Sequence, residues 1–269
     1  MAPPDLDDLL AEGREVDVEA AWGAGFLAGR FVPGRTSWTW AEVVEPGLRG
    51  ARSLLDLGTG EGGELTSLAP LPPLTVATEG WLATVPAAIR TLRPAEVQLV
   101  VCASAPDNLD PPGPNIGLPF ADASFGTVLS RHESFDPAEV RRVCRPGGRF
   151  ITQQVGTAES AGARALLGLA PEPGDWDLRT AAAQVEGAGW VVEASGEERP
   201  LNRLTDVAAL VGYVRSTPWQ FEEVLADPDA FHADGPLGPT LRTVDERCHR
   251  EGGVTFPGHR FWLRARLPG

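Results

Sequence analysis

The feature that most constrains this chain is a glycine-rich segment that directly follows a short apolar run. Residues 53–65 read SLLDLGTGEGGEL. An apolar run of this length, followed by glycines and then helix-forming residues, predicts a buried strand, a tight loop and the start of a helix. Glycine tolerates positive φ and lets a ligand approach the backbone closely, and the first turn of the helix offers free N–H groups. The segment therefore predicts a strand–loop–helix unit that binds a ligand at its loop.

The chain on both sides of residue 100 repeats this alternation of strand and helix. Further strands are expected at 74–81, 97–102, 125–133, 145–156, 190–195 and 252–267, and helices at 81–94, 136–144 and 178–190. Continuous apolar strands between helices are typical of a parallel sheet covered on both faces. In the last strand Phe261, Leu263 and Ala265 would share one face. We predict an α/β, Rossmann-like three-layer sandwich around a seven-stranded, mostly parallel sheet with the last strand antiparallel.

Two segments fall outside this pattern. Residues 1–50 read as helical and aromatic-rich and precede the first good strand, so we expect an N-terminal helical lid. Residues 51–269 would form the core, with a helical insert at about 204–251.

Composition excludes several classes of function. The 269 residues include 23 basic and 37 acidic side chains, for a net charge of −14, which disfavours a nucleic-acid binder. The three cysteines have no metal-ligand or redox spacing, and neither do the histidines, so we predict reduced thiols and no metal. No secretory signal and no apolar run of ~20 residues is present, which predicts a cytoplasmic protein without a membrane partner.

Two cofactors compete for the glycine loop. Gly58, Gly60 and Gly63 satisfy the GxGxxG spacing of dinucleotide-binding proteins, and Glu79 ends the next strand, where a carboxylate can bind both ribose hydroxyls. Asp56, however, lies two residues before the first glycine. Its carboxylate would repel a pyrophosphate, whereas it suits a ligand that carries an ammonium and a sulfonium group.

Two downstream motifs resemble those of a known family. Residues 118–125, LPFADASF, precede the strand at 125, and Arg145-Pro146-Gly147-Gly148 precede the next strand. Together with the glycine loop and Glu79, these landmarks across residues 52–156 resemble the class I S-adenosylmethionine-dependent methyltransferases. The segments TEGW, SRHE and TQQVG also resemble an uncharacterised actinobacterial-type subgroup of small-molecule methyltransferases.

The resemblance implies a set of residues that bind S-adenosyl-L-methionine and its product S-adenosyl-L-homocysteine. Gly58, Thr59 and Gly60 would wrap the methionine and ribose, Asp56 would hold the amino group, and Glu79 would hold the ribose diol. Trp81 would cover the adenine. The other cofactor contacts that we carry over are Gly80, Ala105, Asp107 and Ser130. The chain departs from the family where an acid normally meets the adenine amino group, and Asp107 or Asn108 would replace it.

Residues 130–133, SRHE, lie at the carboxyl end of the fourth strand, where α/β sheets bind ligands. His132 is a candidate general base, or else bonds the backbone in a structural role. Arg131 would fix a carboxylate of the substrate, or else pair with Glu79 or Glu133. Gln153 would face the pocket or bond a neighbouring loop, and so would Gln154.

Aromatic side chains supply the candidate substrate contacts. They would form apolar walls over the substrate, or else pack the helices on the sheet. They are Trp22, Phe26, Trp38 and Trp219.

We therefore predict an S-adenosylmethionine-dependent methyltransferase that modifies O, N or C of a small molecule, as a monomer or homodimer. The alternatives are a nucleic-acid base methyltransferase, an NAD-dependent oxidoreductase, an enzyme of the same fold that uses the cofactor without methyl transfer, and a non-catalytic cofactor-binding partner.

Overall fold

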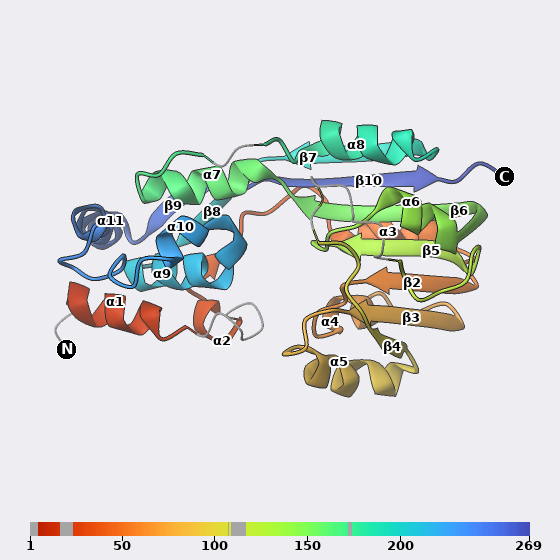
Figure 1. Ribbon diagram of the computed structural model, residues 1–269, viewed down its shortest axis with the longest axis horizontal. Helices are drawn as coiled ribbons and strands as arrows, with labels where there is room; N and C mark the ends of the chain where they lie inside the picture. The colour runs from red at the N-terminus through yellow and green to blue at the C-terminus, as the bar shows by residue number, and fades with distance from the viewer. Residues whose placement is uncertain (1–4, 17–23, 107, 109–116, 172–173) are drawn as a thin grey trace. The chain divides into compact units, whose positions relative to one another are not determined.

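The computed structural model describes residues 5–16, 24–106, 108, 117–171 and 174–269. The chain forms two compact units (Figure 1). The larger unit combines residues 37–156, 174–198 and 260–269, and the smaller unit combines 1–36, 157–173 and 199–259. The chain therefore passes between the units five times.

The larger unit is built on the predicted seven-stranded sheet. Its strand order is β4-β3-β2-β5-β6-β10-β7. The strands are β2 (Ser53–Leu57), β3 (Leu74–Glu79), β4 (Gln98–Val101), β5 (Phe125–Arg131), β6 (Cys144–Val155), β7 (Val191–Glu198) and β10 (Arg260–Arg266). Strands β2 to β6 pair in parallel, whereas β10 is antiparallel to both β6 and β7. The predicted fold class is confirmed.

Helices cover both faces of this sheet, which explains why its central strand β2 is buried at all five positions. The helices are α3 (Trp40–Leu48), α4 (Gly63–Ser67), α5 (Val85–Leu92), α6 (Pro137–Val143) and α8 (Leu178–Gly187), with the 3-10 turn η2 (Arg93–Ala95). Side chains of α3 and α5 pack in one apolar cluster with Leu54 and Ile151. Side chains of α6 and α8 pack in another cluster, which also holds Phe261, Leu263 and Ala265, as predicted for one face of the last strand.

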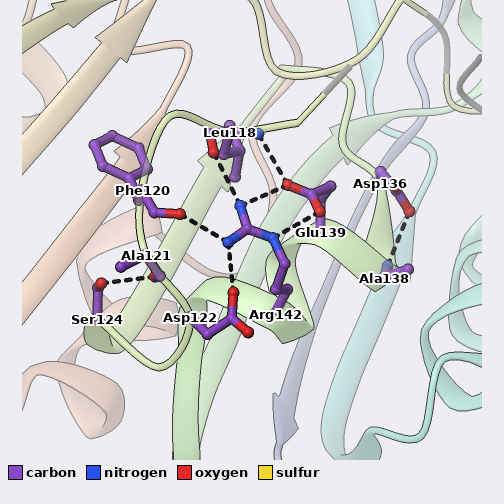
Figure 2. Close-up of polar contacts among 9 residues, drawn as sticks. All are labelled: Leu118, Phe120, Ala121, Asp122, Ser124, Asp136, Ala138, Glu139 and Arg142. Carbon is purple, nitrogen blue, oxygen red and sulfur yellow. Dashed lines mark hydrogen bonds and ion pairs between the residues drawn. The ribbon is translucent and has the colours of Figure 1, made fainter. Parts of the chain in front are cut away.

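The loop between residues 118 and 124 is fixed by one arginine of α6 (Figure 2). Arg142 donates hydrogen bonds to the carbonyl oxygens of Leu118 and Phe120, at 2.9 and 2.7 Å. It also forms ion pairs with Asp122 and Glu139, both at 2.8 Å. These contacts therefore hold the LPFADASF segment in one conformation where it leads into β5.

The smaller unit has a core of its own. It contains the antiparallel sheet β1-β8-β9, formed by β1 (Phe31–Val32), β8 (Leu201–Leu204) and β9 (Val254–Pro257). Its helices are α1 (Leu6–Arg14), α2 (Ala24–Leu27), α7 (Thr157–Leu166), α9 (Val207–Ser216), α10 (Glu222–Leu225) and α11 (Gly238–Glu251), with the turn η3 (Pro218–Gln220). Nine of the ten residues of α9 are buried, so this helix is the centre of the unit. No helix in the described part of the chain is long and apolar enough to span a bilayer.

The long strand predicted at 252–267 is two strands in different sheets. β9 belongs to the small sheet and β10 to the large one. Between them the N–H of Gly258 donates to the carbonyl oxygen of Pro200, and the N–H of His259 donates to the buried carboxylate of Glu159. These partners lie about 60 and 100 residues away along the chain, so the alternation of the sequence does not reveal the break. Helix α3, inside the segment predicted as a lid, is part of the larger unit, and the lid role itself stays a prediction.

Candidate functional site

The glycine loop after β2 adopts a backbone that only glycine tolerates easily. Gly58, Gly60 and Gly62 have φ of 61°, 57° and 82°. The N–H of Thr59 donates to the carbonyl oxygen of Thr78 at 2.8 Å, which ties the loop to the end of β3. A Cβ added at Gly60 would meet nothing within 4 Å. The loop is therefore held in place and faces open space at Gly60, where a ligand can approach the backbone.

Glu79 bridges the glycine loop and the segment after β3. Its Oε2 accepts the N–H of Gly60 at 2.7 Å, and its Oε1 accepts the N–H of Trp81 at 2.6 Å. The side chain is only 6% exposed. Because a carboxylate oxygen has two lone pairs, each can still accept a hydroxyl. The geometry suits the predicted ribose contact.

Three carboxylates gather at this edge of the sheet: Asp56 at the end of β2, Glu79 at the end of β3, and Glu133 just after β5. A Cβ added at Gly58 would meet the Glu133 carboxylate at 2.5 Å, so this carboxylate lies directly against the loop. Burial, followed by the charge of Glu79, raises the pKa of Glu133 to about 7. Burial also raises the pKa of Asp56 to about 7. A cationic ligand would relieve this clustering of negative charge.

The turn after β5 presents Glu133 in this position. His132 has φ of 60°, and its N–H donates to the carbonyl oxygen of Gln153 at 2.8 Å. The Oγ of Ser130 and the Nε2 of Gln154 both donate to the carbonyl oxygen of Glu133, at 2.9 and 3.0 Å. Gln154 therefore bonds a neighbouring loop, as one of the two roles considered from the sequence requires. The predicted cofactor residue Ser130 is fully buried beneath it.

The imidazole of His132 is held as a neutral ring. Its Nε2 lies 3.0 Å from Nε2 of Gln153, and because an amide nitrogen only donates, the imidazole nitrogen must accept. The surrounding protein, then the charges of Arg131 and Arg260, lower the pKa of His132 well below its ordinary value. The side chain of His132 is itself exposed, so the charges of the two arginines contribute more to this shift than burial does. The general-base role of His132 stays a prediction.

Arg131, the last residue of β5, lies beside this turn. Its Nη1 is 3.5 Å from the carboxylate of Glu64, which replaces the pairing with Glu79 or Glu133 considered from the sequence. Its guanidinium charge also opposes the upward shift in the pKa of Asp56. Arg131 therefore carries a positive charge close enough to act on the acidic cluster.

The other predicted contacts are distributed over both units. Gly80 comes directly after β3 and packs closely against the segment that follows β4. A Cβ added at Gly80 would lie 2.8 Å from the Cα of Ala103. Ala105 is buried two residues further on. Trp38 packs edge-on against Trp262, with ring centroids 6.3 Å apart, and these four residues all belong to the larger unit.

Phe26 and Trp219 belong to the smaller unit. The guanidinium of Arg30 stacks 4.5 Å from the centre of the Phe26 ring, and Trp219 is half exposed in η3. Trp22 and Asp107 lie outside the described residues. The substrate roles of all these aromatic residues stay predictions.

Comparison with known proteins gives likeness in structure without close likeness in sequence. No model of a protein family matches the chain, and no curated protein matches it. Among solved structures, a protein from Bacillus halodurans C-125, provisionally assigned as a methyltransferase, matches with a TM-score of 0.56 at 17% identity, over 85% of this chain and 98% of that one. The YcgJ protein of Bacillus subtilis matches with a TM-score of 0.53 at 14% identity, over 85% and 99%.

The chain has the fold of the class I S-adenosylmethionine-dependent methyltransferases. In this methyltransferase fold the glycine loop, Glu79 and the turn after β5 lie at the carboxyl ends of adjacent parallel strands, β3, β2 and β5. Open α/β sheets bind ligands at such an edge. From the sequence, Glu133 is expected only as a partner for Arg131, and Arg260 is not among the predicted site residues. The side chain of Glu133 reaches the loop through a turn with positive φ, for which the sequence carries no clear signal.

Proposed function

We propose that this protein is an S-adenosylmethionine-dependent methyltransferase that acts on a small molecule. The observation that carries the proposal is the group of three acids around the glycine loop, of which Asp56 and Glu79 are buried and Glu133 is partly buried. Such a group suits a ligand with an ammonium and a sulfonium charge and disfavours a pyrophosphate. The methyltransferase fold agrees with this choice.

The residues of the loop would bind and orient the cofactor, which supplies an electrophilic methyl group when bound. Glu79 would accept hydrogen bonds from the two ribose hydroxyls while it holds the N–H groups of Gly60 and Trp81. Asp56 and Glu133 would face the ammonium group, which would stabilise their ionised forms. In-line transfer needs orientation of both reactants, and this positioning is the main contribution that the chain would make.

The turn after β5 would meet the acceptor. His132 is neutral and can receive a proton from an acceptor hydroxyl or amine once that group displaces the Gln153 amide from Nε2. Gln153 and Trp38 lie on the same edge of the larger unit and would contact the acceptor beside it. The acidic composition argues against nucleic acid as the acceptor.

Calorimetric titration of the full chain with S-adenosylhomocysteine, with NADH in parallel, tests the proposal. We expect micromolar binding of the first and none of the second. Glu79→Gln keeps the size of the side chain but removes its charge, and we expect it to weaken binding at least tenfold, because two hydroxyl contacts lose a charged acceptor. The control is Glu45→Gln, on the exposed side of α3, which should bind like the parent.

Other outcomes point elsewhere. Binding of NADH instead would make the chain an oxidoreductase, and binding of neither ligand would remove the cofactor assignment. Tight retention on heparin would favour a nucleic-acid acceptor. Unchanged affinity in Glu79→Gln would mean that the ligand binds away from β3.

A further inference from the structure

Arg131 carries a positive charge at the place where the glycine loop begins. It is the last residue of β5, which pairs in parallel with β2 so that Ser130 lies opposite Leu57. Neighbouring strands are about 4.8 Å apart, so Arg131 follows at the level where β2 passes into Gly58. The glycine loop and this arginine therefore lie side by side at one edge of the sheet.

Two interactions show that the side chain of Arg131 extends toward the loop. Its Nη1 lies 3.5 Å from the carboxylate of Glu64, in the first turn of the helix that follows the loop. Its charge also opposes the rise in the pKa of Asp56, the buried acid that precedes the loop. The guanidinium of Arg131 is therefore within electrostatic reach of the residues at both ends of the glycine loop.

One donor of this guanidinium lacks an acceptor. Nε of Arg131 is buried, and none of the residues that the structure describes accepts a hydrogen bond from it. In a planar guanidinium the Nε–H and one N–H of Nη2 point the same way, and this pair of donors matches the two oxygens of a carboxylate. Glu64 lies at Nη1 instead, and its side chain is 58% exposed. A buried donor without an acceptor costs free energy, so this side of Arg131 favours an acidic ligand group.

The loop leaves space for such a group. A Cβ added at Gly60 or at Gly63 would meet nothing within 4 Å. Gly63 comes directly before Glu64, so the open side of the loop reaches the residue with which Arg131 forms its ion pair. A ligand that lies along the loop can therefore bring one end close to Arg131.

The cofactor proposed for the loop ends in an amino acid, whose ammonium and carboxylate groups share one carbon atom. A site for this end needs acidic and basic side chains close together, and Asp56, Glu133 and Arg131 meet that need. We propose that Arg131 binds the carboxylate of the cofactor and so selects ligands that keep this carboxylate over ligands that carry only the ammonium group. The inference rests on the proposed function, since it concerns the cofactor of that site. The carboxylate expected at Arg131 from the sequence would then belong to the cofactor rather than to the acceptor.

The test is calorimetric titration of the full chain with S-adenosylhomocysteine and, in parallel, with decarboxylated S-adenosylhomocysteine, which differs only in the missing carboxylate. We expect the parent to bind the intact ligand at least tenfold more tightly, because only that ligand accepts the paired donors of Arg131. Arg131→Gln should weaken the intact ligand at least tenfold. It should not weaken the decarboxylated ligand, which brings only a positive charge to this side of the loop. Arg131→Lys keeps the charge but not the paired donors, so its loss should be smaller.

Arg266→Gln is the matched control, because it removes the same charge at the opposite end of the sheet. There Arg266 forms an ion pair with Glu193 at 2.9 Å. Its affinity for both ligands should equal that of the parent. A loss in Arg266→Gln as large as that in Arg131→Gln would show a general charge effect and would overturn the proposal. So would an Arg131→Gln variant that weakens both ligands equally, since a purely structural role of Arg131 predicts that result.

The proposed function and the role of Arg131 fail in different ways. If the parent binds neither ligand, both are overturned. If it binds the two ligands equally, only the role of Arg131 is overturned. Circular dichroism identifies a variant that does not fold. If Arg131→Gln is such a variant, Arg131→Lys decides, since it should weaken the intact ligand and not the decarboxylated one.

Discussion

At the scale of single residues, Asp56 is a buried acid. We expect its ionised carboxylate to lower the stability of the fold and to bind the positively charged ligand. Its carboxyl has a pKa of about 7 in the folded chain, against 3.8 ordinarily. Between these two values the folded state keeps the proton while the unfolded chain releases it. Stability therefore falls as pH rises through this window, and stays low above pH 7.

Asp56→Asn should therefore make the protein more stable and a poorer ligand binder. At pH 8 we expect the free energy of unfolding to rise by on the order of 1–3 kcal/mol, because the amide cannot ionise. The difference should vanish below about pH 4, where the parent carboxyl is protonated in both states. Affinity for S-adenosylhomocysteine at pH 8 should fall at least tenfold. Urea unfolding measures the stability and calorimetry measures the affinity, with the exposed Asp234→Asn as control. If Asp56→Asn is no more stable than the parent at pH 8, burial of the Asp56 carboxylate does not lower the stability of the fold.

The same scale shows what sequence alone could reach. Glu79 was predictable, because its place at the end of the second strand follows from local patterns around residues 74–81. Glu133 was not, since its approach to Gly58 depends on the positive φ of His132 and on the amide of Gln154. Arg260 was not either, because only the antiparallel direction of β10 brings it to the edge where Arg131 ends its strand.

At the scale of elements, strands with many local apolar residues were predictable and strands defined by distant partners were not. β2 is buried at all five positions and reads as a strand by itself. β1 has only two residues and exists because it pairs with β8, about 170 residues later. The break between β9 and β10 likewise depends on Pro200 and Glu159 rather than on the alternating run that spans it.

Helix α6 offers a prediction at this scale, because Arg142 connects it to the loop before β5. Arg142→Met should lower the free energy of unfolding by on the order of 2 kcal/mol, since two carbonyl oxygens and Glu139 lose charged donors (Figure 2). The guanidinium of Arg142 lowers the pKa of Glu139, so this stabilisation is present above pH 4.5 and is lost as pH falls through the folded pKa. The gap between the variant and the parent should therefore narrow in acid. Arg141→Met, exposed on the same helix, is the control for urea unfolding, and an equal loss there would contradict the role of the loop contacts.

At the scale of the whole molecule, the candidate site draws all its described acids and arginines from the larger unit. The larger unit is assembled from three stretches of chain, and the smaller unit is assembled from the stretches between and before them. The smaller unit has its own apolar core, centred on α9 and covered by α1. A change in that core should therefore destabilise the smaller unit and leave ligand binding at the glycine loop unchanged.

Gly13 tests this separation. It lies on α1 against α9, where an added Cβ would be 2.7 Å from Cβ of Val211 and 2.9 Å from the carbonyl oxygen of Ala208. Gly13→Ala should therefore push the two helices apart and raise amide hydrogen exchange in α1 and α9, despite the better helix propensity of alanine. Gly25→Ala in α2 is the matched control, because its Cβ meets nothing within 4 Å, and it should leave exchange unchanged or lower it. Mass spectrometry measures amide hydrogen exchange in both units of one sample. We expect β2, β5 and β6 to exchange as slowly as in the parent. The affinity for S-adenosylhomocysteine should stay within twofold of that of the parent. A marked loss of affinity in Gly13→Ala, but not in Gly25→Ala, would show that the core of the smaller unit supports the site, contrary to this prediction.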